Sequence, residues 1–277
     1  MNDVQSRQAT VIAVTGGKGG VGKTNVAINV AAGLSRYGHR VALIDGDFGL
    51  GSVDVMLGLT PRAHVGHVLS GERTLSEVLL DGPCGVRILP AASGVQPLTT
   101  LTAEQRARLD AALAEARATH DFLIIDTAPG IGDHVVTMLT LAQHVLLVTS
   151  TDPAAMVDAY AVAKVLWQIA PGAQISLVAN GVRNDAEGRQ AFRQIDRAAV
   201  RFLGHNLRYL GSVPDDQAVR DAIVQQRALL EHLPQAPASR SLRLIATRLA
   251  TLSASPGGLR LMPRAGDTPD PEVWRCA

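Results

Sequence analysis

Residues 15–25 read TGGKGGVGKTN, a glycine-rich turn that carries two lysines five residues apart. Within it, residues 17–24 match the pattern G-x-x-x-x-G-K-[ST] and lie between an apolar run, TVIAV at 10–14, and a helix-length segment at 25–37. Glycines let successive backbone N–H groups turn toward phosphate oxygens, and the start of the following helix adds the positive end of its dipole. The stretch therefore predicts a phosphate-binding loop between a strand and a helix. The alternative is a turn that only connects the two.

Short apolar runs recur along the chain and alternate with helix-length segments. The runs are TVIAV (10–14), RVALID (40–45), GVRILP (85–90), DFLIID (121–126), HVLLVTS (144–150), QISLVAN (174–180) and LRYLGSV (207–213). The longer segments between them include 25–37, 103–119 and 153–169. This alternation predicts strand–helix–strand units around a mostly parallel sheet. Because the runs are apolar throughout, we expect helices on both faces of the sheet, an α/β fold of the P-loop NTPase kind.

The division of the chain follows from its composition. No repeat or low-complexity linker interrupts the 277 residues before about residue 254, after which proline, glycine and charge occur together. We expect a short N-terminal arm at 1–9, a single nucleotide-binding domain at 10–253 and a loosely ordered tail at 254–277.

Composition and cysteine spacing exclude several classes of protein. Aromatic residues make up only 3% of the chain, so its core has to consist mainly of Ala, Val, Leu and Ile. The polar start and the short apolar run at 11–14 predict neither a signal peptide nor a membrane span, and we expect a cytoplasmic protein. Cys84 and Cys276 lie far apart, which predicts neither a disulfide framework nor a zinc or iron–sulfur site.

Carboxylates follow two of the apolar runs, at the edge of a parallel sheet where ligands bind. LIID ends at Asp126, the place of the acidic residue on the metal side of P-loop ATPases, and VALIDGDFG contains Asp45 and Asp47. We expect Asp126 and Asp47 to serve the metal and Asp45 to brace the loop. In the phosphate loop, Lys23 would contact the β- and γ-phosphates and Thr24 would place its hydroxyl on Mg²⁺.

The lysine pair resembles the signature of the MinD/ParA class of ATPases, K-G-G-x-x-K-[ST], which residues 18–24 match. The resemblance implies an ATP hydrolase with ATP and Mg²⁺ as ligands, in which Lys18 reaches the phosphates of a second subunit in a nucleotide-sandwich homodimer. A cation that reaches the phosphates only when the dimer forms would stabilise charge on the transferred phosphoryl group. The resemblance also implies that Asp47 positions the attacking water and that Asp126 belongs to the metal shell.

The same resemblance predicts the base-binding residues. Asn180, at the end of LVAN, matches an asparagine that reads the adenine edge, although it is alternatively a turn residue at a strand end. VPDDQAVR at 213–220 matches the loop that encloses the base through Pro214 and Asp216. The residues expected to contact ATP are Gly17, Lys18, Gly19, Gly20, Val21, Gly22, Lys23, Thr24, Asn25, Asn180, Pro214 and Asp216. Those expected to hold the metal are Thr24, Asp47 and Asp126, and those expected to act in hydrolysis are Lys18, Lys23 and Asp47.

Longer stretches resemble, within that class, the flagellar-number regulators of the FleN/FlhG type. They include GVRILPAASG (85–94), DTAPGIGDHVV (126–136), TDPAAMVDAYAVAKVL (151–166) and EGRQAF (187–192). This likeness implies two partners, a flagellar master transcription activator and a signal-recognition-type flagellar GTPase. Some relatives carry a D-Q-A-x-x-L-R segment at the front, which residues 1–10 do not match, so the GTPase contact would be absent or built differently.

Residues 239–252, SRSLRLIATRLATL, form an amphipathic pattern with Leu242, Ile245 and Leu249 on one face. The pattern fits a last helix docked on its own domain, which the lack of Trp and Phe favours. It also fits attachment to an anionic membrane surface, at the inner membrane or the cell pole.

Four arginines spaced by four residues are expected to line one helix face. They are Arg189, Arg193, Arg197 and Arg201. The row is either a solvated face or a site for an acidic partner, a phosphate backbone or lipid headgroups. Asp152 and Asp158 are candidates either for helix caps or for a partner surface.

Two functions fit these patterns. The first is an ATP-dependent dimerising switch that regulates flagellar number. The second is a ParA-like partitioning or positioning ATPase that binds DNA non-specifically, which the arginine row supports. The net charge of +1 makes direct DNA binding the weaker expectation. A cluster-transfer protein like the nitrogenase iron protein would need a cysteine pair that this chain lacks.

Overall fold

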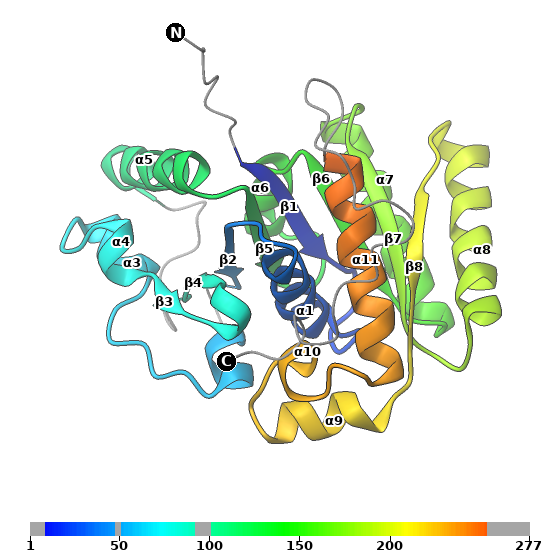
Figure 1. Cartoon of the computed structure of the whole chain (residues 1–277). Coiled ribbons are helices and arrows are strands. Elements are labelled where there is room, and N and C mark those ends of the chain that lie inside the picture. Colours follow the sequence, from blue (N-terminus) through cyan, green and yellow to red (C-terminus); the bar gives the residue numbers. More distant parts are fainter. Residues whose placement is uncertain (1–8, 48–50, 92–100, 254–277) are drawn as a thin grey trace, which may run out of the picture.

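A mostly parallel β-sheet forms the centre of the protein (Figure 1). The computed structural model describes residues 9–47, 51–91 and 101–253, and within them the sheet has eight strands in the order β3-β4-β2-β5-β1-β6-β7-β8. The strands are β1 (Thr10–Thr15), β2 (Val41–Gly46), β3 (Leu80–Asp81), β4 (Arg87–Leu89), β5 (Phe122–Thr127), β6 (His144–Thr149), β7 (Gln174–Val182) and β8 (Arg208–Pro214). All neighbouring strands are parallel except β3 and β4. The predicted α/β fold is confirmed.

Helices cover both faces of this sheet. They are α1 (Lys23–Arg36), α2 (Val53–Leu57), α3 (Val65–Ser70), α4 (Leu75–Val78), α5 (Ala103–Thr119), α6 (Asp133–Thr140), α7 (Pro153–Ile169), α8 (Asp185–Leu203), α9 (Gln217–Val224), α10 (Leu229–His232) and α11 (Pro237–Ser253). Helices α1, α10 and α11 pack on one face, and α3 to α8 pack on the other. The apolar residues of strand β1 are buried on both faces of the sheet. Ile12 and Val14 face α1, whereas Val11 and Ala13 face the opposite side. Continuous apolar runs are what such a doubly covered sheet requires.

The structure corrects the predicted elements in two places. The run at 85–90 forms only the three-residue strand β4, because Pro83–Gly85 makes a 3₁₀ turn just before it. The antiparallel edge strand β3 was not predicted, because two residues are too few to show the alternation of apolar and polar residues that is typical of a strand. The N-terminal residues 1–8 and the predicted tail at 254–277 lie outside the described residues.

Helix α11 docks on its own domain, as the first of the two interpretations predicts. Leu242, Ile245 and Leu249 are buried in the core that α1 and β8 share. A Cβ on Gly33 of α1 would lie 2.8 Å from the Cβ of Ala246, so the glycine lets the two helices approach closely. In this conformation the apolar face of α11 is covered by protein.

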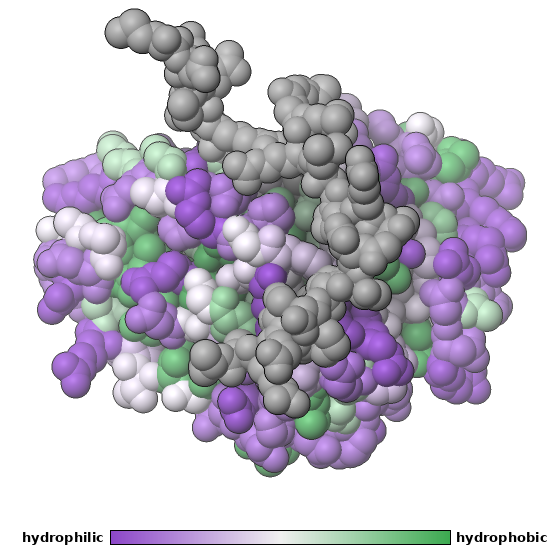
Figure 2. Space-filling model, in the orientation of Figure 1, coloured by the Kyte–Doolittle hydropathy of each residue, from purple (hydrophilic) through white to green (hydrophobic). Residues whose placement is uncertain are grey.

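Where grey residues do not cover this view, hydrophilic residues predominate and hydrophobic residues lie in patches between them (Figure 2). Among the helices that the structure describes, none combines the length and the apolar character needed to cross a bilayer.

Replacement of Leu242 by alanine is expected to lower the free energy of unfolding by about 2–5 kcal/mol, because it leaves a cavity between α11 and α1. Leu244→Ala on the same helix is the matched control, since Leu242 is 0% exposed and Leu244 is 50% exposed. Urea unfolding followed by circular dichroism measures both. Equal stability of the two variants would mean that α11 does not belong to the core.

Candidate functional site

The phosphate loop follows β1 at the carboxyl edge of the sheet and ends where α1 begins, at Lys23. Gly20 and Gly22 have φ angles of +79° and +90°, a conformation that side-chain-bearing residues rarely adopt. A Cβ on Gly17 would lie 2.4 Å from the backbone carbonyl of Asp158 in α7. The first turn of α1 has no side-chain cap, so its N–H groups are available to an anion.

Lys23 is the cation at the base of this loop. It is only 7% exposed. Burial lowers the pKa of its ammonium group, and the nearby carboxylates of Asp126 and Asp47 oppose that shift. A desolvated lysine held near carboxylates is suited to neutralise a phosphate that enters the same space.

Asp45 and Asp126 lie opposite each other in the paired strands β2 and β5. Burial raises the pKa of Asp126 to about 7 and the pKa of Asp45 to about 6. Asp45 accepts hydrogen bonds from the backbone N–H groups of Asp47, Ser52 and Val53, at 3.1, 2.9 and 3.1 Å. The expected bracing role of Asp45 is thus confirmed: its carboxylate ties the end of β2 to the start of α2.

Asp126 and Thr24 fit a magnesium ion. Asp126 Oδ1 is buried and has no hydrogen-bond partner among the described residues, which is unusual for a buried carboxylate. The Thr24 hydroxyl lies close enough to hydrogen-bond with Asp126, and it stands 3.2 Å from the hydroxyl of Ser52. The described residues contain no group of three or more His, Cys, Asp and Glu arranged for a metal. Mg²⁺ needs none, since it takes one or two protein oxygens together with phosphates and waters.

Lys18 points away from this cluster, toward the start of α7. Its Nζ lies 3.4 Å from Asp152 Oδ2, and both side chains are about half exposed. Asp152 also caps α7, because its Oδ1 accepts hydrogen bonds from the N–H groups of Ala154 and Ala155. The capping interpretation of Asp152 is confirmed, and the two lysines of the loop have separate surroundings.

The predicted base-binding residues lie at the ends of β7 and β8. Asn180 Nδ2 donates a 2.8 Å hydrogen bond to the carbonyl of Val21 in the phosphate loop. Pro214 is the last residue of β8. Asp216 caps α9 through the N–H of Ala218, and its other oxygen accepts the N–H of Ala238 in α11. The contacts of Asn180, Pro214 and Asp216 with adenine stay predictions.

Comparisons with known proteins agree with this fold. A family model described as an AAA domain matches residues 9–176. The antiactivator FleN of Pseudomonas aeruginosa is 44% identical over 90% of this chain and 89% of its own length. The flagellum site-determining protein YlxH of Helicobacter pylori is 30% identical over 87% of this chain and 81% of its own. The chain belongs to the MinD/ParA family of ATPases, among its FleN/FlhG-like members. The fold of the family is seen in the MinD–Mg-ADP complex of Pyrococcus horikoshii, with a TM-score of 0.71, 21% identity and coverage of 89% of this chain and 99% of that one.

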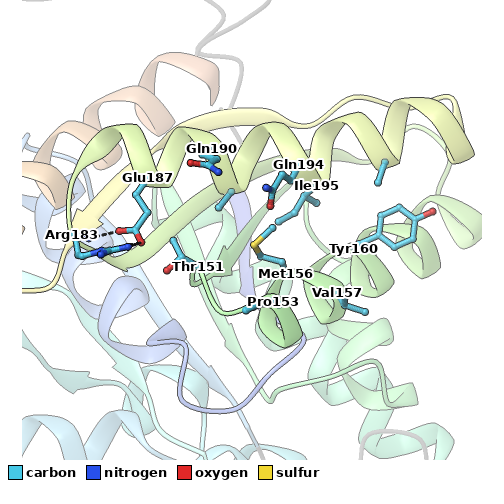
Figure 3. A pocket seen from close by; sticks show the side chains of 12 residues that line it. Thr151, Pro153, Met156, Val157, Tyr160, Arg183, Glu187, Gln190, Gln194 and Ile195 are labelled. Carbon is cyan, nitrogen blue, oxygen red and sulfur yellow. Dashed lines mark hydrogen bonds and ion pairs between the residues drawn. The ribbon is translucent and has the colours of Figure 1, made fainter.

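This MinD/ParA chain also has a groove of about 560 Å³ between α7 and α8 (Figure 3). Met156, Tyr160 and Ile195 are among its lining residues, and an ion pair between Arg183 and Glu187 lies at one end. Thr151 and Pro153, the neighbours of Asp152 in sequence, line the groove as well. The start of α7 is therefore common to the groove and to the contact with Lys18.

The arginine row of this MinD/ParA chain lies on α8. Arg189 pairs with Asp185 and lies over the ring of Tyr209, 5.0 Å from its centroid. Arg193 and Arg197 are exposed and form no ion pair within the described part of the chain. Both interpretations of the row, a solvated face and a site for an acidic ligand, stay open.

Sequence patterns missed two contacts of the site. Ser52 reaches Thr24 across 28 residues, and Lys18 reaches Asp152 across 134. A P-loop pattern marks Thr24 and Lys18 but carries no information about their distant partners. The aspartate before a proline at a helix start was a readable capping signal for Asp152, whereas Ser52 has no comparable signal.

Proposed function

We propose that the chain is an ATP-dependent dimerising ATPase that acts as a switch in the control of flagellar number. The observation that carries this proposal is the separation of the two lysines of one loop. Lys23 lies buried beside Asp126, whereas Lys18 lies half exposed on Asp152. A loop that needed only to bind phosphate in its own subunit would have no use for the second, outward cation.

The groups around the loop have distinct tasks in this proposal. Loop N–H groups and Lys23 bind the phosphates, and Thr24 with Asp126 would hold Mg²⁺. When bound, Mg²⁺ neutralises charge on the β- and γ-phosphate oxygens. Asp47, whose carboxylate lies near Lys23 and Asp126, would accept a hydrogen bond from the attacking water and orient it.

Dimerisation would complete the site by moving Lys18 from Asp152 to the γ-phosphate of the second subunit. An exposed ion pair contributes only about 0–1 kcal/mol, so its loss opposes this movement weakly. The added cation would stabilise the charge that develops during phosphoryl transfer. ATP binding and the dimer would thereby favour each other, and hydrolysis would reset the switch.

The proposed partners follow from the relatives. FleN is described as an antiactivator and YlxH as flagellum site-determining. By that likeness we propose that the ATP-bound dimer of this chain acts on a flagellar transcription activator, and, with weaker support from the sequence of residues 1–10, on a flagellar GTPase. Both contacts would take place at the cytoplasmic side of the membrane or at a cell pole.

Replacement of Asp47 by alanine is expected to leave ATP binding within a few-fold of wild type and to slow hydrolysis at least about tenfold, because the water loses its positioning group. The variant should accumulate as a dimer with ATP and Mg²⁺ and as a monomer with ADP, measured by size-exclusion chromatography with light scattering. Asp110→Ala removes an exposed carboxylate of α5 and is the matched control. Hydrolysis at the wild-type rate would refute the role given to Asp47.

The same ATP-bound sample separates the two candidate functions. The exposed Arg193 and Arg197 keep a ParA-like partitioning ATPase as the second candidate. An ATP-specific dimer that ignores added duplex DNA supports the flagellar switch. A dimer that coats duplex of any sequence, and does so less at higher salt, would favour the partitioning function instead.

A further inference from the structure

Asn180 contacts the phosphate loop directly. Its Nδ2 donates to the carbonyl of Val21 at 2.8 Å, which joins residues 159 positions apart in the sequence. The same nitrogen would lie 2.2 Å from a Cβ on Gly22, so the amide rests against the backbone of the loop. Glycine at position 22 is therefore required twice, by its φ of +90° and by the approach of Asn180.

The end of β7 is shaped to bring this side chain to the loop. The pairing of β7 with β8 shifts register between Asn180 and Val182, and Gly181 has a φ of +67°. Such an irregularity re-aims a side chain at the end of a strand. At the other end of the contact, the side chain of Val21 is buried in the core under α1, which holds its backbone in place.

The hydrogen bond determines the direction of the amide. Since the Val21 carbonyl can only accept, the nitrogen of Asn180 must face it and the oxygen must face away. A primary amide has two N–H groups and an acceptor oxygen. One N–H is used on Val21, and no other hydrogen bond of this side chain occurs within the described residues. The second N–H and the oxygen remain for a ligand.

The contact also determines the direction of a loop N–H. In a trans peptide the C=O and the following N–H point to opposite sides. Holding the Val21 carbonyl toward Asn180 therefore turns the Gly22 N–H away from Asn180. That N–H is one of the donors expected to bind phosphate.

We propose that Asn180 is a positioning residue for the phosphate loop, and that it couples recognition of the base to the shape of the loop through a single amide. The proposal rests on the proposed binding of ATP at this site. An asparagine that served only to read adenine would have no effect on a ligand that lacks a base. An asparagine that holds Val21 affects every ligand whose phosphates bind the loop.

The test uses ligands with and without a base. Asn180→Leu and Asn180→Ala both remove the donor without adding charge, and titration calorimetry compares Mg²⁺–ADP with Mg²⁺–tripolyphosphate. We expect tripolyphosphate to bind about tenfold more weakly, since the hydrogen bond that holds the loop is lost. ADP should weaken at least as much, since it also loses the contacts of its base with the amide. Tripolyphosphate affinity within twofold of wild type, with weakened ADP, would leave Asn180 as a reader of the base and overturn the proposal.

A second measurement needs no nucleotide. Hydrogen exchange of the apo protein is expected to become about tenfold faster in the peptide that covers residues 16–24, and to stay unchanged in α7. Asn184→Asp is the matched control, because Asn184 caps α8 through its oxygen and aspartate keeps that acceptor. Unchanged exchange of the loop in both Asn180 variants would also overturn the proposal. If the wild-type protein bound no nucleotide, the proposed function would be contradicted. The exchange experiment would still test the contact between Asn180 and the loop, because it uses no nucleotide.

Discussion

Replacement of Lys23 by alanine is expected to raise the dissociation constants for Mg²⁺–ATP and Mg²⁺–ADP by at least about 100-fold. Lys23 is 7% exposed and lies near the carboxylates of Asp126 and Asp47. Without its ammonium group the incoming phosphates would meet those carboxylates with no cation of the same subunit between them. Titration calorimetry or fluorescence of a labelled nucleotide measures the loss.

The controls for Lys23→Ala come from the other lysines of the chain. Lys164 is exposed on α7, and Lys164→Ala should leave nucleotide affinity unchanged. Lys18→Ala should change the affinity of the monomer only a few-fold, because that side chain lies on Asp152 rather than in the loop. Thermal unfolding shows whether the Lys23 variant is folded. A folded variant that binds ATP like the wild type would remove Lys23 from the phosphate site.

The sequence predicts those parts of the site that a strand end brings together. Asp45, Asp126 and Asn180 stand near the ends of apolar runs that form strands, and the phosphate loop with Thr24 follows another such strand. Parallel strands end at one edge of a sheet. The topology alone therefore gathers these residues, and no knowledge of side-chain contacts is needed. The fold was predictable for the same reason, since runs buried on both faces leave few arrangements.

The rest of the site depends on contacts that local patterns do not contain. The base contact predicted for Asp216 stays a prediction, whereas the sequence does not show that its two carboxylate oxygens bind helix starts, those of α9 and α11. Ser52 reaches Thr24 only because Asp45 holds the start of α2 against β2. These geometries arise when separate elements pack together, and no period or motif within a single segment encodes them.

The contact between Lys18 and Asp152 links the loop to a surface that a partner could reach. Asp152 caps α7, and its neighbours Thr151 and Pro153 line the groove between α7 and α8. A change at the start of α7 would alter the surroundings of Lys18 without touching the buried cluster of Lys23 and Asp126. If Lys18 acts in hydrolysis as the proposed function holds, a change at the start of α7 would affect hydrolysis more than nucleotide binding.

Replacement of Lys18 by alanine is expected to lower the rate of ATP hydrolysis on the order of 10³-fold, because the cation that stabilises the transferred phosphoryl group is lost. Binding of ATP to the monomer should change only a few-fold. The rate is measured as phosphate release at saturating ATP over a range of protein concentrations. Asp152→Asn serves as the control, since it keeps a side chain that can cap α7 while removing the charge that pairs with Lys18.

Mixing two inactive variants tests whether Lys18 acts across the dimer. In a mixed dimer of Lys18→Ala and Asp47→Ala, the subunit that keeps Asp47 would receive Lys18 from its partner, so one of its two sites is complete. Random pairing makes half of the dimers mixed, and the mixture should regain about a quarter of the wild-type rate. If Lys18 acted within its own subunit, neither site of the mixed dimer would contain both groups. The mixture would then stay as inactive as its components, and the role of Lys18 in dimerisation-dependent hydrolysis would be wrong.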